Sequence, residues 1–168
     1  GEAEVYNGKE DVPDILRGIE PADYDIATSA HPDQVQALFP RTIPVGAAFG
    51  VILVIEGGRR YEVATFRREA EYEDGRHPSQ IAYATVEEDA RRRDFTVNGL
   101  RLDPVTGRII DCVEGRADIA HRRVRTIGDP ELRFAEDRLR MLRAVRFAAN
   151  LDFSIHPETL DAIRSHAN

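Results

Sequence analysis

The stretch "EPADYDIATSA", residues 20–30, decides how the rest of the chain is interpreted. Two aspartates, Asp23 and Asp25, stand on either side of a tyrosine, and a run of apolar and small residues follows them. In a strand, side chains two positions apart face the same way, so these carboxylates would project together. Adjacent carboxylates repel each other unless a cation neutralises them, and Mg²⁺ prefers oxygen ligands of this kind. The pattern indicates either a solvated turn or a metal site.

A third carboxylate favours the metal site. Glu62 lies in "YEVATF", residues 61–66, an alternating strand in which Tyr61 and Val63 face the opposite side. A glycine-rich turn joins this strand to "GVILVIE", residues 50–56, as a β-hairpin. A carboxylate on a neighbouring strand could complete a site for two metal ions ~3.5–4 Å apart. The expected catalytic and metal-binding residues are Asp23, Asp25 and Glu62.

Composition excludes several classes of protein. The chain has 168 residues, of which 42% are hydrophobic and 32% charged, and its formal net charge is -7. This length suits one domain, or one domain with the start of another. No apolar run reaches the ~18–20 residues of a membrane span, so we expect no membrane association. The single cysteine, Cys112, cannot form an internal disulfide, which favours the reducing cytoplasm.

Hydrophobic periodicity and turn residues predict a mixed α/β domain whose small sheet passes into helices. Strands are expected at about residues 3–7, 23–27, 50–56 and 61–66, with a second hairpin at 103–111. Helices are expected at about residues 12–18, 32–39, 136–150 and after "HPETL", with another starting at a Thr85–Glu88 capping box. The polar stretch 67–80 is expected to be a long mobile loop. Leu139, Leu142, Val145 and Cys112 are expected in the core.

The expected helix 136–150 offers a way to recognise a nucleobase. Asp137 and Arg140 are three residues apart, so they would be neighbours on one helical face. Aspartate accepts hydrogen bonds and arginine only donates them. Cytosine and adenine each present an amine donor beside a ring-nitrogen acceptor, whereas uracil and guanine present the reverse pattern. The pair therefore suits cytosine and adenine, or is an ordinary surface ion pair. Arg143 and Arg146 on this helix could face phosphate or water.

Taken together, these motifs resemble the head domain of class II tRNA nucleotidyltransferases. That family comprises the bacterial and eukaryotic CCA-adding enzymes, with bacterial poly(A) polymerases as close relatives. The resemblance covers roughly residues 12–164 and includes the D-x-D pair, "YEVATFR", "EYEDGRHP", "RRDFTVN" and "EDRLRMLRAVRFAA" in the family's order. It implies an α+β fold of the polymerase-beta-like nucleotidyltransferase type. The head would span residues 1–128 and the first neck helices 129–168, and the family's body and tail domains would be absent.

The resemblance also implies an activity. CMP and AMP would be transferred from CTP and ATP to the 3′ end of tRNA in a Mg²⁺-dependent reaction that releases pyrophosphate. The D-x-D aspartates and Glu62 would bind two metal ions. The nucleotide-binding residues implied by position are Gly8, Asp14, Arg92, Arg93, Asp94, Asn98, Asp137, Arg140, Arg143 and Arg146. The sequence identifies no protein partner.

One segment departs from the family pattern. The family carries a Gly-Gly pair followed by Val-Arg-Asp before the D-x-D, where the backbone approaches the triphosphate closely. In the corresponding "NGKEDVPDILRG", residues 7–18, Lys9 and Glu10 fall where the glycines belong, and Pro13 replaces the arginine. Proline removes both a cation and a backbone donor. Two alternatives therefore stay open, namely poly(A) polymerase activity and a non-catalytic nucleotide- or RNA-binding domain.

Overall fold

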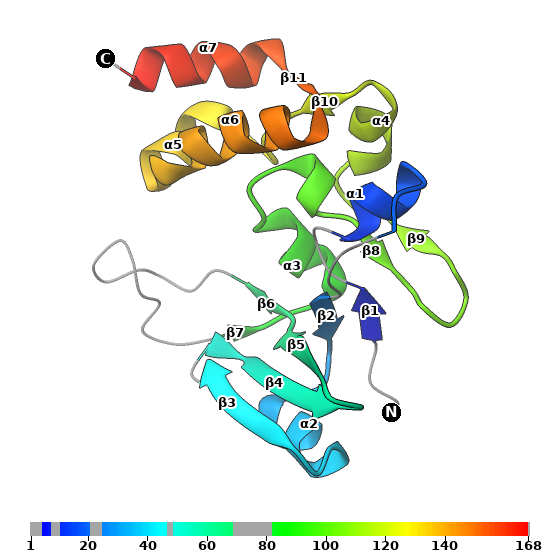
Figure 1. Cartoon of the computed structure of the whole chain (residues 1–168). Coiled ribbons are helices and arrows are strands. Elements are labelled where there is room, and N and C mark those ends of the chain that lie inside the picture. Colours follow the sequence, from blue (N-terminus) through cyan, green and yellow to red (C-terminus); the bar gives the residue numbers. More distant parts are fainter. Residues whose placement is uncertain (1–4, 8–10, 21–24, 47–48, 69–81, 168) are drawn as a thin grey trace. The chain divides into compact units, whose positions relative to one another are not determined.

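The computed structural model describes residues 5–7, 11–20, 25–46, 49–68 and 82–167. The chain forms two compact units, each described here by itself (Figure 1). Unit 1 comprises Gly1–Asp89 and Arg101–Ile110, and unit 2 comprises Ala90–Leu100 and Asp111–Asn168. None of the helices in the described part of the chain has the length and hydropathy that a membrane span requires.

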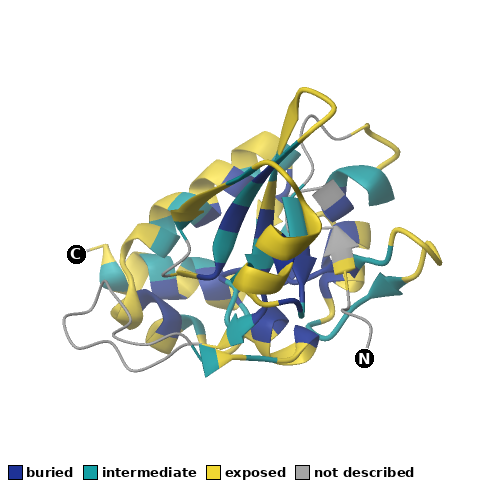
Figure 2. Cartoon of the chain, turned by 90° about the horizontal axis from the view of Figure 1, so that it is seen from below, coloured by how far each residue is buried: buried dark blue, intermediate teal, exposed yellow. Residues whose placement is uncertain are grey.

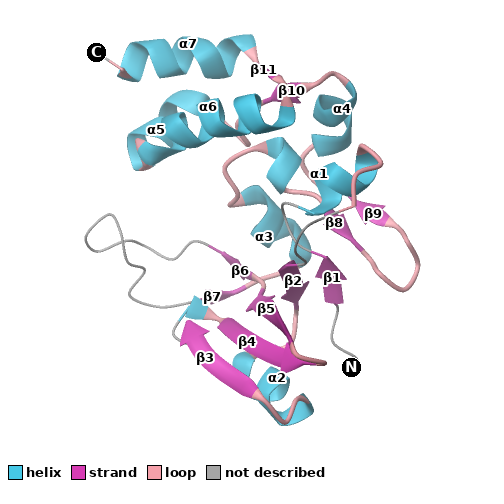
Figure 3. Ribbon diagram, in the orientation of Figure 1, coloured by secondary structure: helices cyan, strands magenta, loops and turns pink. Residues whose placement is uncertain are grey.

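A seven-stranded mixed sheet forms the frame of unit 1, in the order β3-β4-β5-β2-β1-β8-β9 (Figure 3). Its strands are β1 (Val5–Asn7), β2 (Asp25–Thr28), β3 (Thr42–Gly46), β4 (Val51–Glu56), β5 (Arg59–Thr65), β8 (Arg101–Leu102) and β9 (Ile109–Ile110). Only β2 and β5 among these neighbours pair in parallel. β6 (Arg67–Arg68) and β7 (Ala82–Tyr83) form a separate antiparallel pair. The helices are α1 (Asp11–Leu16), α2 (Pro32–Leu38) and α3 (Val86–Arg91), of which α3 ends in unit 2.

The predicted hairpin of β4 and β5 is confirmed, and it carries the core of unit 1. Gly57 and Gly58 connect the strands with φ angles of 56° and 78°, a backbone conformation that glycine adopts without steric cost. Ile52 and Val54 alternate with less buried residues along β4. Figure 2 colours the chain by burial, and buried segments occur in both its strands and its helices. They form one apolar cluster with Val63 of β5 and Val35 of α2. One face of the hairpin is therefore buried beneath α2.

A buried ion pair fastens α3 to the sheet. The carboxylate of Asp89 accepts a hydrogen bond from the Arg101 guanidinium at 2.7 Å, and both side chains are only 1% exposed. Asp89 also accepts from the backbone N–H of Arg67. The predicted capping box starts this helix, since Thr85 and Glu88 each accept from the other's backbone N–H. Asp89 thus joins α3 to β8 and to the start of β6.

Unit 2 consists mainly of helices around buried phenylalanines. Its elements are η2 (Thr96–Asn98), α4 (Gly115–Ala120), β10 (Arg123–Val124), α5 (Pro130–Glu136), α6 (Leu139–Leu151), β11 (Ser154–Ile155) and α7 (Pro157–His166). β10 and β11 pair in parallel. Phe95 meets Phe147 of α6 edge to face, with ring centroids 5.8 Å apart, and Phe134 of α5 is also buried. These aromatic rings supply much of the apolar surface that unit 2 buries.

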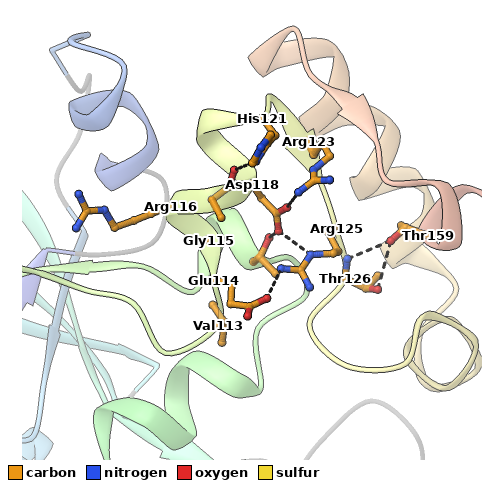
Figure 4. Close-up of polar contacts among 12 residues, drawn as sticks. Val113, Glu114, Gly115, Arg116, Asp118, His121, Arg123, Arg125, Thr126 and Thr159 are labelled. Carbon is orange, nitrogen blue, oxygen red and sulfur yellow. Dashed lines mark hydrogen bonds and ion pairs between the residues drawn. The ribbon is translucent and has the colours of Figure 1, made fainter.

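One carboxylate organises the polar interior of unit 2. Asp118 of α4 has no exposed surface, and it accepts hydrogen bonds from the Thr96 hydroxyl and from Nε of Arg125, both at 2.7 Å (Figure 4). Arg123 forms an ion pair with its other oxygen at 3.1 Å. Because a buried charge must be compensated, these contacts fix η2, α4 and β10 together.

The structure corrects the expectation of one helix over residues 136–150. Two helices, α5 and α6, meet there, and Asp137 between them is extended, with φ -150° and ψ 107°. Its carboxylate accepts from the backbone N–H of Leu139, a local bond that competes with helix continuation. The expectation that Leu139, Leu142 and Val145 form core is also wrong, because all three are exposed. A different stripe of α6, with Ala144 and Phe147, is buried.

Other expectations differ in detail. Arg67 and Arg68, expected in a loop, form β6, and residues 69–81 of that stretch lie outside the described part of the chain. The second hairpin uses β8 and β9, so its first strand precedes the expected 103–111. Cys112, expected in the core, is only partly buried. β3, α4, β10 and β11 were not predicted, because short strands and one-turn helices leave little periodicity to detect.

We expect Arg101→Met to lower the free energy of unfolding by about 3–5 kcal/mol, since it leaves the buried Asp89 charge uncompensated. Urea denaturation followed by circular dichroism measures this. Arg164→Met is the matched control, because Arg164 forms an exposed ion pair with Asp161, and its loss should cost less than about 1 kcal/mol. Equal effects of the two substitutions would contradict the structural role of the Asp89–Arg101 pair.

Candidate active site

Two of the three predicted metal ligands face each other across neighbouring strands. In the parallel pairing of β2 with β5, Asp25 is the register partner of Glu62. Neighbouring strands lie about 4.8 Å apart, and side chains at paired positions share a face of the sheet. The next residue of β5, Val63, is buried in the core, so Glu62 is on the opposite, exposed face. Asp25 on β2 is partly buried. The two carboxylates therefore lie side by side.

This pair suits a hard metal ion. Carboxylate oxygens are the ligands that Mg²⁺ selects, and two of them on one face reduce their mutual repulsion by binding a cation. Asp23, the third predicted ligand, lies outside the described residues, as does Gly8. No cluster of three His, Cys, Asp or Glu residues with the geometry of a metal site occurs in the described ranges. Of the three predicted ligands, Asp25 and Glu62 are the two that the structure describes, and they could hold a metal together.

The predicted residue Asp14 lies in α1 of unit 1. Its carboxylate forms an ion pair with Arg17 one helical turn later, at 3.3 Å, and both side chains are partly exposed. Pro13 stands in the first turn of this helix, where a missing backbone N–H costs no intrahelical hydrogen bond. The structure of α1 therefore accounts for the ion pair of Asp14 and for the position of Pro13.

Three predicted nucleotide-binding residues come together in unit 2. The buried carboxylate of Asp94 accepts from the Asn98 amide and the Phe95 backbone N–H, both at 2.9 Å. It also accepts from Nε of Arg143 at 2.6 Å. Burial opposes ionisation of Asp94, but the Asn98 hydrogen bond and the charge of Arg143 outweigh it, so its pKa lies below the usual 3.8. Asp94 is therefore an anion that fixes the direction of Arg143.

Two predicted arginines of α6, Arg143 and Arg146, lie over an aromatic ring. The guanidinium carbons of Arg143 and Arg146 lie 5.4 and 5.0 Å from the centroid of the Phe147 ring. Cation–π contact of this kind holds a guanidinium in place without consuming its hydrogen-bond donors. Arg143 remains 39% exposed, so donors on this side chain are open to solvent. Such arginines are suited to anionic ligands.

Arg92 and Arg93 are held through their backbone by a residue that sequence reasoning did not single out. Nη2 of Arg133, in α5, donates to the carbonyl oxygens of Arg92 and Arg93 at 2.8 and 2.5 Å. Forty residues separate Arg133 from Arg93, and no periodic pattern relates positions so far apart. The sequence signal that could have identified Arg133 is its position three residues before "EDRLR".

Asp137 and Arg140 do not share a helix. They are therefore not the neighbours on one helical face that the sequence predicted. Asp137 is exposed at the end of α5, and Arg140 lies in the first turn of α6. Nη1 of Arg140 donates to Oε2 of Glu136 at 2.5 Å and to the carbonyl oxygen of Arg133 at 3.0 Å. The break between the helices leaves the Asp137 side chain exposed, while Glu136 and the Arg133 carbonyl oxygen hold the Arg140 guanidinium.

A cavity of about 580 Å³ also opens in unit 2. Its lining residues are Arg91, Thr96, Cys112, Val113, Glu114, Arg125, Thr126, Ile127, Gly128 and Arg133. Of the predicted nucleotide-binding residues that the structure describes, none belongs to this lining. Arg125 is paired with Asp118 and Glu114, and Arg133 with Glu136, so carboxylates compensate these charges. Arg91 also lines the cavity, so three arginines and one glutamate belong to its lining.

Comparison with known proteins gives consistent matches along the chain. Residues 11–125 match the family model described as "Poly A polymerase head domain". The CCA-adding enzyme of Levilactobacillus brevis is 47% identical over 165 residues, which are 98% of this chain and 41% of that protein. The CCA-adding enzyme of Bacillus pumilus is 48% identical over 153 residues, or 90% and 38%. The chain thus spans about two fifths of the length of these relatives.

Solved structures of similar proteins also match nearly the whole chain. The Bacillus stearothermophilus CCA-adding enzyme in complex with CTP superposes with a TM-score of 0.88 at 42% identity, over 98% of this chain and 40% of that one. A tRNA nucleotidyltransferase complexed with a primer tRNA and an incoming ATP analog gives 0.81 at 28% identity, over 99% and 47%. These matches confirm the predicted α+β nucleotidyltransferase fold.

The lowered pKa of Asp94 makes a prediction about acid stability. A carboxyl whose pKa is lower in the folded state stabilises that state above its unfolded value of about 3.9, and the contribution disappears as pH falls through the folded pKa. We expect Asp94→Asn to lower the free energy of unfolding by about 1–3 kcal/mol at pH 7. The difference from the wild type should shrink below about pH 4. Urea titrations from pH 7 to pH 3 test this, and a difference that does not change with pH would contradict it.

Proposed function

The chain belongs to the poly(A) polymerase head-domain family, and from this premise we propose that it is the nucleotide-transferring part of a CCA-adding enzyme. Its reaction would add CMP and AMP from CTP and ATP to the 3′ end of tRNA. The observation that carries the proposal is the β2–β5 register, which pairs Asp25 with Glu62 in a chain whose relatives are CCA-adding enzymes. Solved relatives described as complexes with CTP and with primer tRNA support it.

Family members are generally metal-dependent, and the finer proposal is a two-Mg²⁺ site formed by Asp23, Asp25 and Glu62. Bound there, the ions would activate the attacking 3′-hydroxyl and neutralise charge on the departing pyrophosphate. Asp25 and Glu62 contribute the oxygens, and the sheet fixes their spacing. The new bond joins the 3′-oxygen to the α-phosphorus while the bond to pyrophosphate breaks, and the hydroxyl proton leaves to solvent. No protein nucleophile is required, so positioning and charge neutralisation supply the catalysis.

In this proposal, unit 2 recognises the nucleotide. Arg92, Arg93, Asp94 and Asn98 contact the ribose and triphosphate, and Arg143 and Arg146 face phosphate. Asp94 also orients Arg143. Asp137 accepts from the exocyclic amine of cytosine or adenine, and Arg140 donates to the ring nitrogen beside it. Gly8 and Asp14 remain proposed phosphate contacts. The Asp94–Arg143 contact supports this assignment, because it orients an exposed guanidinium with a fixed anion.

The proposal divides the chain into a head over residues 1–128 and the start of a neck over 129–168. The end of the family match at residue 125 supports this boundary. A cytoplasmic location is also part of the proposal. A tRNA substrate and a single cysteine both favour that compartment.

The direct test uses tRNA that ends before CCA, with labelled CTP and ATP in Mg²⁺. Addition of two C residues and one A, then a stop, is the expected result. A long A tail would favour poly(A) polymerase activity instead. CTP binding without incorporation would favour a non-catalytic nucleotide-binding domain.

Removing one carboxylate of the Asp25–Glu62 pair should slow nucleotide incorporation strongly. We expect Asp25→Asn and Glu62→Gln each to reduce nucleotide incorporation by about 10²–10³-fold, because a charge-stabilising group at the reacting atoms is lost. Glu87→Gln, an exposed substitution on α3, is the control and should keep wild-type incorporation. Wild-type rates in Asp25→Asn would show that this carboxylate does not bind a catalytic metal.

Arg140→Ala should relax the choice of base. Loss of a bidentate base contact costs about 1–3 kcal/mol of discrimination, so the preference for CTP over UTP should fall about 10- to 100-fold. Relative kcat/KM values measure this preference. Arg138→Ala is the matched control, because Arg138 is an exposed arginine two residues away. An unchanged preference in Arg140→Ala would contradict the base-reading role.

A further inference from the structure

Arg133 of α5 is a charged side chain with only 8% of its surface exposed. Burying a guanidinium is unfavourable unless its charge and its donors are matched by partners. The exposed arginines of the same unit, such as Arg164, carry no comparable cost. The contacts of Arg133 therefore show which groups compensate its buried charge and which segments it holds together.

The guanidinium contacts the backbone on which two proposed phosphate-binding arginines stand. Nη2 donates to the carbonyl oxygens of Arg92 and Arg93 at 2.8 and 2.5 Å. Nη1 donates to Oε2 of Glu136 at 3.0 Å. The planar fork of arginine can serve these acceptors in fixed directions, which a lysine ammonium does less well. Arg133 thereby fixes the chain immediately before Asp94.

The backbone of Arg133 contacts the proposed base-reading arginine. Nη1 of Arg140 donates to the carbonyl oxygen of Arg133 at 3.0 Å and to the same Oε2 of Glu136 at 2.5 Å. Glu136 is therefore shared by the two arginines. Any shift of Glu136 after loss of the Arg133 guanidinium would move the atom that positions Arg140.

We propose that Arg133 is a positioning residue that couples the phosphate-binding segment 92–94 to the base-reading residue Arg140. The side chain contacts the first part at carbonyl oxygens 92 and 93. It reaches Arg140 through the shared Glu136 carboxylate, and the Arg133 carbonyl oxygen also contacts Arg140. Arg133 acts on base selection only through these contacts. This inference rests on the proposed function, because it assumes that both parts bind one nucleotide.

The test compares Arg133→Met and Arg133→Lys with the wild-type chain. Dissociation constants for CTP and for UTP are measured by titration calorimetry in Mg²⁺, and thermal melting verifies folding. In Arg133→Met we expect CTP affinity to fall by about tenfold or more, because displaced groups lose their alignment. The ratio of UTP to CTP dissociation constants should fall as well. Arg133→Lys should lie between the wild type and Arg133→Met, since it retains the charge without the fork.

Arg164→Met is the matched control, because it removes an arginine that is paired with a carboxylate three residues away but is exposed on α7. It should keep the wild-type ratio. A merely structural role for Arg133 would lower thermal stability without changing the UTP-to-CTP ratio, so an unchanged ratio in a folded variant overturns the inference. If Arg133→Met does not fold, the ratio in Arg133→Lys decides in the same way. Absence of CTP binding by the wild type would instead overturn the proposed function.

Discussion

The parallel pairing of β2 with β5 is the constraint on which the candidate active site depends. The other neighbouring strands of the sheet run antiparallel, and the hairpin of β4 and β5 buries its apolar face under α2. Once Val63 is committed to that core, Glu62 must face the other way. The register with β2 then places Asp25 beside it. A slip of one residue would bury a carboxylate and expose a valine, so core packing and site geometry enforce each other.

In unit 2 the corresponding constraint is charge compensation. Asp118 and Asp94 are buried carboxylates. Asp118 pairs with Arg123 and Arg125, and Asp94 pairs with Arg143. Asp118 fixes the chain around Thr96, and Asp94 orients Arg143. Arg133 does the reverse, as a buried cation whose two terminal nitrogens donate to carbonyl oxygens and to Glu136. Because removing one partner leaves a buried charge, these pairs hold a single arrangement of the residues proposed to bind nucleotide.

Local sequence signals predicted the features that depend on neighbouring residues. The Thr85–Glu88 capping box and the Gly57–Gly58 hairpin are confirmed because their hydrogen bonds and dihedral angles are local. The break at Asp137 was missed, since the 3.6-residue period continues through "EDRLRMLR" while one side-chain bond to Leu139 ends the helix. The exposed leucines of α6 were wrongly expected in the core. The helix carries two apolar stripes, and its composition does not say which of them is buried.

The sequence singled out candidate site residues but not the contacts among them. Asp94 and Asn98 were singled out in one motif and Arg143 in another, and the structure joins them in one network. Arg133 was not predicted, because its role depends on carbonyl oxygens forty residues away and any residue type has a carbonyl. Asp23 and Gly8 lie outside the described residues, so their roles stay predictions.

The central claim is that Asp25 and Glu62 bind the metal that acts on a nucleotide. A crystal structure of the chain with CTP and Mg²⁺ tests it most directly. The account predicts a metal ion about 2.0–2.1 Å from carboxylate oxygens of both residues and bonded to triphosphate oxygens. CTP bound with its phosphates in the cavity lined by Cys112 and Arg125, or a metal ion coordinated by neither carboxylate, would contradict it.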